Sequence, residues 1–233
     1  MFAKDYRQSA WKKLDKKWGV AILSFLVYSL IYGAVSSFTG IGGLIVGGPL
    51  FVGYTAVLMT IVRGGEAKID QVFENFSGRF VSNMATFLLY NVYIWLWSLL
   101  FFIPGIVKSY SYAMTFYILN DNPEMGANEA ITRSRQIMDG NKWRLFCLGF
   151  SFIGWSLLCS LPTLIALGAI LGMAYRGQSL AVLLWLIPAS IPSFIGYLFL
   201  RPYQEAAYAA FYRDVSGTEA YTVLLDSEDD YTV

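Results

Sequence analysis

The chain has 233 residues, of which 56% are hydrophobic and 14% charged, with a formal net charge of +1 and a mean hydropathy of +0.50. Soluble domains carry charges on about a quarter of their residues, so this composition excludes an ordinary water-soluble domain and indicates a membrane protein. The sequence contains no histidine, the commonest general base and transition-metal ligand. We therefore expect no cofactor, no metal site, no enzymatic activity and no nucleic-acid partner.

The first predicted element is a basic amphipathic helix at residues 2–18. Its apolar residues recur every four positions and its lysines and arginines fill the remaining faces, which is typical of helices that lie in the lipid headgroup layer. The uncharged run 19–38 is close to the ~20 residues that cross a bilayer. After a glycine-rich break, a second span is predicted at 44–63. Gly43 and Gly47 form a G-x-x-x-G pattern that allows close helix contact.

A second unit begins with another amphipathic segment, residues 66–79, whose apolar side chains recur at helical spacing. No formally charged residue occurs between Arg79 and Lys108. A third span is therefore predicted at 80–103 and, after a proline-glycine break, a fourth at 105–120. This unit has the same order of elements as the first.

A third amphipathic helix is predicted at 123–139. The fifth span, 144–175, is long enough to need a bend, which Pro162 would supply. A sixth span is predicted at 192–213. The residues between these two spans, 178–191, fit a span, a re-entrant segment or a loop at the outer surface.

The three units share a short motif where their return spans begin. Residues 49–54 and 192–197 share the pattern P-x-F-[VI]-G-Y, and residues 104–109 form a looser copy. The residues predicted to break the helices here are Pro49, Pro104, Gly105 and Pro192. The predicted fold class is an all-α integral membrane protein with about six transmembrane helices in three repeated units, each preceded by a cytoplasmic interfacial amphipathic helix.

The distribution of basic residues predicts the topology. With six spans and a cytoplasmic N-terminus, all 17 lysines and arginines except Lys108 and Arg176 lie on the cytoplasmic side, as the positive-inside rule requires. Both termini are then cytoplasmic. Residues 1–215 form a single membrane domain, and residues 216–233 form an acidic tail that is predicted to be disordered.

Lys108 is the main candidate for a functional residue, because it takes the place that Gly53 and Gly196 hold in the other two units. A charge in the hydrophobic zone favours a functional role, but a lysine near the outer surface also extends readily to water. On a continuous helix Lys108 shares a face with three polar residues, Ser111, Tyr112 and Thr115. Glu205 is its predicted counter-charge, with Arg201 as a competing partner for Glu205.

Basic and aromatic residues mark the start of the first and third units. These residues are Lys17, Trp18, Arg133, Arg135, Lys142, Trp143 and Arg144. Each basic residue near an anionic membrane contributes about 1 kcal/mol of attraction, although the positive-inside rule alone accounts for nearly the same set. The expected partner is membrane lipid with anionic headgroups. Other membrane proteins and a second copy of the chain are further candidates.

The run IPGIVKSYSYAMTFYILNDNPEMGANEAITRSRQIMDGNKWRLF, with the later FIGYLFLRPYQEAAYAAFY, resembles an uncharacterised family of bacterial integral membrane proteins. That family is common in Gram-positive bacteria and is catalogued as a domain of unknown function. The resemblance covers nearly all of the chain except the acidic tail. It implies a location in the bacterial plasma membrane and brings no activity, substrate or catalytic residue. A weaker similarity in arrangement is to the membrane domain fused to some bacterial glycerophosphodiester phosphodiesterases.

Two functions are predicted from these features. The first is a non-enzymatic membrane protein that binds lipid or partner proteins. The second is a small transporter or lipid-handling protein with an anionic-ligand path near Lys108. A continuous polar cavity that reaches Lys108 from outside would favour the second, and a closed apolar interior the first. An intramembrane enzyme is the weakest hypothesis, because the sequence offers no acid–base constellation.

Overall fold

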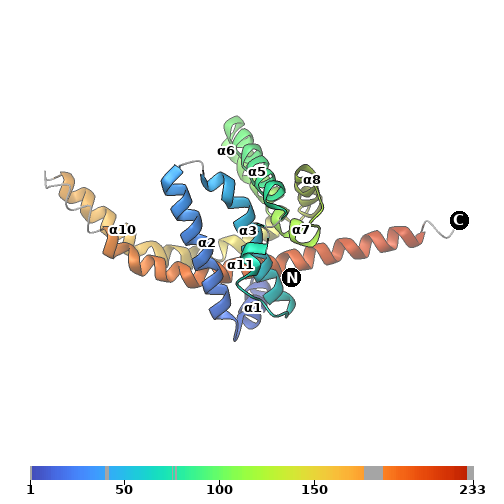
Figure 1. Cartoon of the computed structure of the whole chain (residues 1–233), viewed down its shortest axis with the longest axis horizontal. Helices are drawn as coiled ribbons and strands as arrows, with labels where there is room; N and C mark the ends of the chain where they lie inside the picture. The colour runs from blue at the N-terminus through green and yellow to red at the C-terminus, as the bar shows by residue number, and fades with distance from the viewer. Residues whose placement is uncertain (1, 40–41, 75, 77, 176–185, 230–233) are drawn as a thin grey trace.

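The computed structural model describes residues 2–39, 42–74, 76, 78–175 and 186–229 (Figure 1). The secondary structure within these ranges is helical and includes no strand. Three helices are long and apolar enough to cross a membrane: Trp18–Phe38, Gly42–Arg63 and Ile153–Met173. An all-helical chain with three such segments is compatible with a membrane protein.

The helices follow one another in this order: α1 (Ala3–Leu14), α2 (Trp18–Thr39), α3 (Gly42–Arg63), α4 (Gln71–Glu74), α5 (Phe80–Leu100), α6 (Phe102–Tyr112), α7 (Thr115–Asp121), α8 (Ala127–Ile137), α9 (Lys142–Phe150), α10 (Ile153–Tyr175) and α11 (Leu186–Asp229). Consecutive helices contact each other as pairs, α2 with α3, α5 with α6 and α10 with α11. These pairs extend from a common base in different directions (Figure 1).

The base is built around α3. This helix contacts α1, α2, α4, α5, α7 and α11, and nearly all of its side chains from Leu50 to Val62 are buried. In the most apolar stretch of α3, 72% of the residues are buried, whereas the same share is 11% in α2 and 6% in α10. Helix α3 is therefore the core of the molecule, while α2 and α10 present most of their apolar surface outward, as helices in contact with lipid do.

Glycines allow α2 and α5 to approach the first half of α3. A methyl group added at Gly43 would lie 3.3 Å from the ring of Tyr32, and one added at Gly47 would lie 2.8 Å from the ring of Phe87. Both contacts are tighter than side chains normally make, so larger residues do not fit without movement. The close helix contact predicted from the G-x-x-x-G pattern is confirmed at these two glycines.

Two further glycines of α3 lie against backbone. A methyl group at Gly48 would overlap the carbonyl of Asn83 in α5, and one at Gly53 would overlap the carbonyl of Val72 in α4. Backbone cannot move aside as a flexible side chain can, so these positions require glycine. They fix the places where α4 and α5 dock on α3.

The second amphipathic segment is helical over a much shorter stretch than the predicted 66–79. Only α4 is helical, because Val72 is fully buried against the middle of α3 and the flanking chain turns at Gly64 and Gly78, where φ is +87° and +82°. The loop before α4 is also tied to the start of α2, since the Lys17 ammonium donates to the carbonyl of Gly65 over 2.7 Å.

Helix α1 is likewise shorter than the predicted 2–18. It ends before Lys16, whose φ of 61° lies in the left-handed region. Tyr6, Ala10 and Leu14 are at most 1% exposed, and α1 contacts α9 and α11. Much of the apolar stripe that was expected to face lipid therefore contacts protein.

The predicted fourth span, 105–120, is interrupted between α6 and α7. The cause lies in α8, from which the Ser134 hydroxyl donates to the carbonyl of Ser111 over 2.9 Å and accepts from the amide of Met114 over 3.1 Å. A side chain inserted among the backbone groups breaks the helical ladder. The prediction of one continuous helix was therefore wrong here.

The predicted fifth span, 144–175, is interrupted between α9 and α10, and α10 continues through Pro162 where the bend was expected. The guanidinium of Arg7 donates to the carbonyl of Ser151 over 3.2 Å. The next residue, Phe152, is 1% exposed and its ring packs edge-on against a tyrosine of α11. A contact with the N-terminal helix thus sets the break.

The helix breaks predicted at Pro49 and Pro192 were wrong, and the one predicted at Pro104 lies three residues earlier. Pro49 and Pro192 lie inside α3 and α11, because helices in apolar surroundings tolerate proline when neighbouring groups satisfy the freed carbonyl. Pro104 lies in the first turn of α6, where an amide hydrogen is not needed. The break before it is at Phe101, which is extended with φ −159°. Gly105 allows close contact between α6 and α5.

The remaining bounds also differ from the predicted ones. The apolar runs 19–38 and 44–63 and most of 80–103 are helical as α2, α3 and α5. The third amphipathic segment is helical as α8, which is shorter than the predicted 123–139 because it starts only after Gly126.

Helix α11 extends well beyond the predicted sixth span, 192–213. It begins at Leu186, within the segment 178–191 that was left open, and continues to Asp229 through most of the tail, 216–233, that was expected to be disordered. The tail contains no proline, the residue that most strongly opposes a helix. The rest of the open segment and the last residues of the tail lie outside the described part of the chain.

We expect Gly53→Ala to lower the free energy of unfolding by roughly 1–3 kcal/mol, because the added methyl group meets the backbone of α4. Gly33→Ala is the matched control, since a methyl group at Gly33 has no heavy atom within 4 Å. Thermal unfolding of both variants in detergent measures the difference. Equal midpoints for the two variants would contradict the close docking of α4 on α3.

Candidate functional site

Lys108 lines a small cavity that we call the cationic pocket. The pocket has a volume of about 350 Å³ and is formed by side chains of α6, α8, the turn after α8 and the start of α9. Its lining residues are Lys108, Ser111, Thr132, Arg135, Gln136, Asp139 and Lys142. The pocket forms because Ser134 holds α8 along the break between α6 and α7, which brings the polar face of α8 next to Lys108.

The cationic pocket carries three positive charges and one negative charge. Lys142 forms an ion pair with Asp139 at 3.6 Å, while the ammonium of Lys108 lies 4.5 Å from the centre of the Trp97 ring. Arg135 is exposed and adds a third cation. Like charges repel when they are brought together, so an anion with several oxygens in this pocket would stabilise the arrangement.

The pocket changes the predicted topology. The positive-inside reading placed Lys108 on the opposite side of the membrane from Arg135 and Lys142. All three residues line one cavity, which does not fit a placement of Lys108 across a membrane from the other two. The reason is that α8 packs along α6 and does not lie apart from it on a membrane surface.

Only part of the polar face predicted around Lys108 exists. Ser111 lines the pocket with Lys108. Tyr112 is buried and packs its ring near Tyr90 and Tyr93. Thr115 begins α7, is also buried, and its hydroxyl donates to the carbonyl of Tyr112 over 2.7 Å. The helix break between α6 and α7 separates these residues, which a continuous helix would have aligned.

Glu205 has other partners than the predicted one. Its carboxylate accepts a hydrogen bond of 2.8 Å from the hydroxyl of Tyr117, and no ion pair to Glu205 occurs within the described ranges. The guanidinium of the competing residue, Arg201, lies 5.7 Å from the centre of the Tyr197 ring. The predicted pair between Lys108 and Glu205 was therefore wrong.

A polar triad joins three helices that are distant in sequence. The guanidinium of Arg144 in α9 lies 2.7 Å from a carboxylate oxygen of Asp214 in α11, and the hydroxyl of Tyr6 in α1 donates to the same oxygen. Burial raises the pKa of the Asp214 carboxyl, but hydrogen bonds from Tyr6 and Arg144 and the charge of Arg144 outweigh it, so the net pKa is below the ordinary value of 3.8. Arg144 thus serves the fold, where the sequence suggested a lipid contact.

Of the other predicted interfacial residues, some pack against the protein and others are exposed. Trp18 packs edge-on against Trp11 with ring centres 5.3 Å apart, at the edge of an apolar groove between α1, α10 and α11. Trp143 is 70% exposed and stacks on Phe146. Arg133 lines a neighbouring hollow at the start of α8, which shares Thr132 and Gln136 with the cationic pocket.

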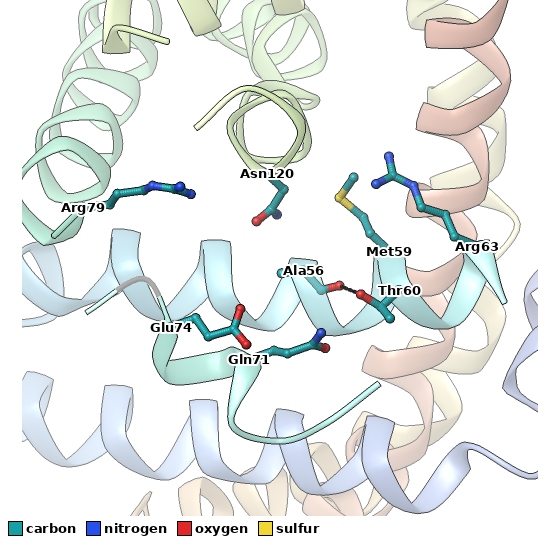
Figure 2. Close-up of a pocket in the computed structure, with 8 residues that line it drawn as sticks. All are labelled: Ala56, Met59, Thr60, Arg63, Gln71, Glu74, Arg79 and Asn120. Atoms are coloured by element: carbon teal, nitrogen blue, oxygen red, sulfur yellow. Dashed lines mark hydrogen bonds between the residues drawn. The ribbon is translucent and has the colours of Figure 1, made fainter. Parts of the chain in front are cut away.

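A second polar hollow, which we call the α3 cavity, lies between α3, α4 and α7 and has a volume of about 340 Å³. Its lining residues are Ala56, Met59, Thr60, Arg63, Gln71, Glu74, Arg79 and Asn120 (Figure 2). The sequence identified none of them as site residues. Gln71 and Glu74 lie in α4 and Arg79 follows it, all three within or next to the segment 66–79 that was predicted as an interfacial amphipathic helix.

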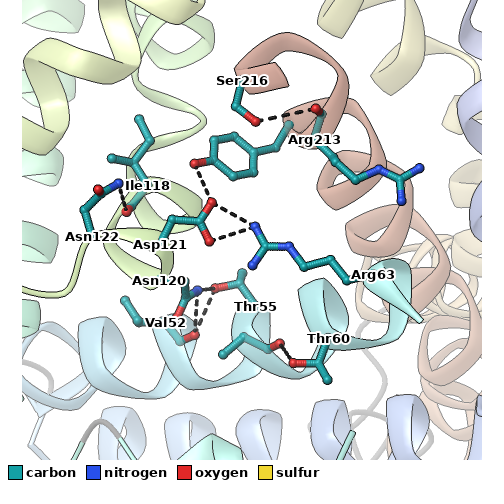
Figure 3. Close-up of polar contacts among 12 residues, drawn as sticks. Val52, Thr55, Thr60, Arg63, Ile118, Asn120, Asp121, Asn122, Arg213 and Ser216 are labelled. Carbon is teal, nitrogen blue, oxygen red and sulfur yellow. Dashed lines mark hydrogen bonds and ion pairs between the residues drawn. The ribbon is translucent and has the colours of Figure 1, made fainter. Parts of the chain in front are cut away.

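One end of the α3 cavity is closed by a network around Asp121 (Figure 3). Arg63 donates to both carboxylate oxygens of Asp121 at 2.7 and 2.8 Å, and the hydroxyl of Tyr212 donates to one of them at 3.0 Å. The amide of Asn120 donates to backbone and side-chain oxygens of α3. The only signal in the sequence was that Arg63 and Asp121 each end an apolar run.

The described residues include no group of three or more histidine, cysteine, aspartate or glutamate side chains placed to hold a metal ion. Cys147 and Cys159 are both free thiols.

A family model described as a protein of unknown function (DUF975) matches residues 99–219 of the chain. The match includes every residue of the cationic pocket and excludes all but one residue of the α3 cavity. No curated protein and no solved structure shows significant similarity to the chain. The family description assigns no activity, ligand or partner.

We expect Asp214→Asn to reduce stability by about 1 kcal/mol near neutral pH, since it removes the charge that Arg144 and Tyr6 share in a partly exposed setting. Because the folded pKa of Asp214 is lowered, its contribution is complete above pH 3.8 and is lost as the pH falls through the folded pKa. The midpoints of wild type and variant, measured by thermal unfolding, should therefore converge below pH 3.8.

Glu66→Gln provides the control, because Glu66 is exposed and has no side-chain partner in the described part of the chain. Its midpoint should follow that of the wild type across the same pH series. A gap between wild type and Asp214→Asn that stays constant down to pH 2.5 would show that the triad does not hold its charge in the folded protein.

Proposed function

Since the chain belongs to DUF975, a family of proteins of unknown function, we propose its role from its geometry: it is a non-enzymatic, multi-spanning plasma-membrane protein that binds anionic lipid headgroups in the cationic pocket. The observation that carries this proposal is the meeting of Lys108, Arg135 and Lys142 around one cavity that contains a single carboxylate. A phosphate-bearing headgroup supplies the oxygens that these cations require.

The surroundings of the pocket support a position at the membrane interface. Lys108 lies against the ring of Trp97, and Lys142 precedes the exposed Trp143. Tryptophan is enriched at the level of the headgroups, where its ring meets both apolar and polar surroundings. Three cations in the hydrocarbon core would be far less favourable than three cations among headgroups.

The position of the pocket bears on the number of spans. Lys108 follows the turn at Phe101 by seven residues, which is about 10 Å of helix and a third of the hydrocarbon thickness. If Lys108 lies among headgroups, the α5–α6 pair enters one leaflet. Its turn suits this, because Leu99, Phe101 and Ile103 are each at least 70% exposed.

We therefore assign the spans to α2, α3, α10 and the apolar first part of α11, with α5–α6 as a re-entrant pair. An even number of spans keeps both termini on one side, and the many basic residues near the N-terminus favour the cytoplasmic side. The three helix pairs agree in order with the three repeated units, each of which holds an outward and a return helix.

The geometry favours binding over transport for this site. Every residue that lines the cationic pocket comes from α6, α8, the turn after α8 or the first residue of α9. None comes from the helices that we assign as spans. The pocket therefore supports a headgroup site at the edge of the protein, and an anionic-ligand path past Lys108 would require other helices to take part.

The topology predicts that positions 108 and 142 are labelled from the same side of the membrane. Single cysteines are placed by Lys108→Cys and Lys142→Cys in a chain whose Cys147 and Cys159 are changed to alanine. Both cysteines should react with a membrane-impermeant maleimide from the same face of oriented vesicles, and neither should react from the opposite face. Reaction from opposite sides would restore the six-span topology and separate the three cations.

Lipid binding is tested by native mass spectrometry of the full chain from mixed phosphatidylglycerol and phosphatidylcholine. We expect preferential retention of phosphatidylglycerol, and Arg135→Gln and Lys142→Gln should each weaken it about fivefold, from about 1 kcal/mol per charge. Lys68→Gln, which removes an exposed charge outside the pocket, is the matched control. Equal retention by all variants would contradict the proposed site.

A further inference from the structure

The α3 cavity contains two opposite charges without partners. The side chains of Arg79 and Glu74 both line it, and neither makes a hydrogen bond or an ion pair within the part of the chain that the structure describes. Figure 2 shows them extending into the hollow near one end, with Arg63 at the other. Arg63 differs from them, because both oxygens of Asp121 already bind its guanidinium.

We propose that the α3 cavity binds a small water-soluble zwitterion of the α-amino acid class, with the carboxylate of the ligand on Arg79 and its ammonium on Glu74. A guanidinium matches the geometry of a carboxylate through two parallel hydrogen bonds, and a carboxylate side chain is a good acceptor for an ammonium group. This site does not depend on lipid binding at the cationic pocket, which is built by other helices.

The pair of charges selects for a ligand that carries both. A simple anion attracted by Arg79 is repelled by Glu74, and a simple cation attracted by Glu74 is repelled by Arg79. A zwitterion satisfies both side chains at once. Discrimination therefore comes from the repulsive partner as well as from the attractive one.

The size and polarity of the cavity favour a free small molecule. A volume of about 340 Å³ is at the lower end for ligand sites. Six of its eight lining residues are polar or charged, and only Ala56 and Met59 are apolar. The cavity thus offers no apolar channel for an acyl chain, so the zwitterionic headgroup of a membrane lipid is a poorer fit than a free amino acid.

The walls of the cavity are held in place by contacts outside it. Helix α4, which precedes Arg79 and carries Gln71 and Glu74, is fixed by the close approach of Val72 to Gly53. On the opposite wall, the amide nitrogen of Asn120 donates to the carbonyl of Val52 at 3.1 Å and to the hydroxyl of Thr55 at 2.9 Å.

These bonds occupy the donors of Asn120 and leave its side-chain oxygen as an acceptor for a ligand ammonium. Gln71 adds a second neutral amide to the lining. A site whose polar groups are positioned before binding loses less entropy when the ligand arrives. The cavity therefore combines two charges and two amides around a space of suitable size, and hydrogen bonds already orient the amide of Asn120.

The test uses the detergent-purified full chain, titrated with each standard amino acid by calorimetry and thermal unfolding. At least one amino acid should bind and raise the unfolding midpoint. Its N-acetyl derivative, which lacks the ammonium, and its methyl ester, which lacks the carboxylate, should each bind on the order of tenfold more weakly. The comparison needs no variant, so it remains decisive if substitutions impair folding.

Arg79→Gln and Glu74→Gln should each weaken binding of the same amino acid by a similar factor. Lys68→Gln and Glu66→Gln change charges in the neighbouring loop that do not line the cavity, and both should bind as the wild type does. The proposal is overturned if no amino acid binds, if a derivative with one charge binds as tightly as its parent, or if Arg79→Gln and Glu74→Gln bind unchanged.

Discussion

The close approach of neighbouring helices to the backbone of α3 is the constraint on which the rest of the structure depends. Gly48 and Gly53 lie against carbonyl groups of α5 and α4, so a side chain at either position would displace a whole element. Helix–helix association in lipid gains little from the hydrophobic effect and relies on such tight contact. The α3 cavity exists because α4 is docked there, which links the architecture directly to a candidate site.

Side chains from distant segments decide where the apolar runs stop being helical. Ser134 enters the ladder between α6 and α7, and Arg7 binds the carbonyl at the end of α9. In lipid a free backbone carbonyl is costly, so a helix can break only where another group satisfies it. The first of these breaks also builds the cationic pocket, because Ser134 brings α8 beside Lys108.

These contacts explain what the sequence could and could not predict. Charge-free runs of about 20 residues located α2, α3 and α5, and glycine spacing predicted the contacts of Gly43 and Gly47, because both patterns act over a short stretch of chain. The breaks could not be predicted, since their cause lies elsewhere in the sequence. The same holds for Glu205, which meets Tyr117, where the sequence suggested Lys108 as its partner of opposite charge.

The repeated motif shows how a structural position becomes a candidate site. At the first copy of the motif Gly53 lies against the backbone of α4 and needs glycine, and at the third a methyl group on Gly196 would lie 2.8 Å from the sulfur of Cys159, so a larger residue would require that side chain to move. In the middle unit Lys108 faces a cavity of about 350 Å³. Because the side chain at position 108 extends into a cavity, a long residue fits there and its charge is available for binding. The backbone contact of α4 thus accounts for the glycine at position 53, and the cavity beside α6 accounts for the lysine at position 108.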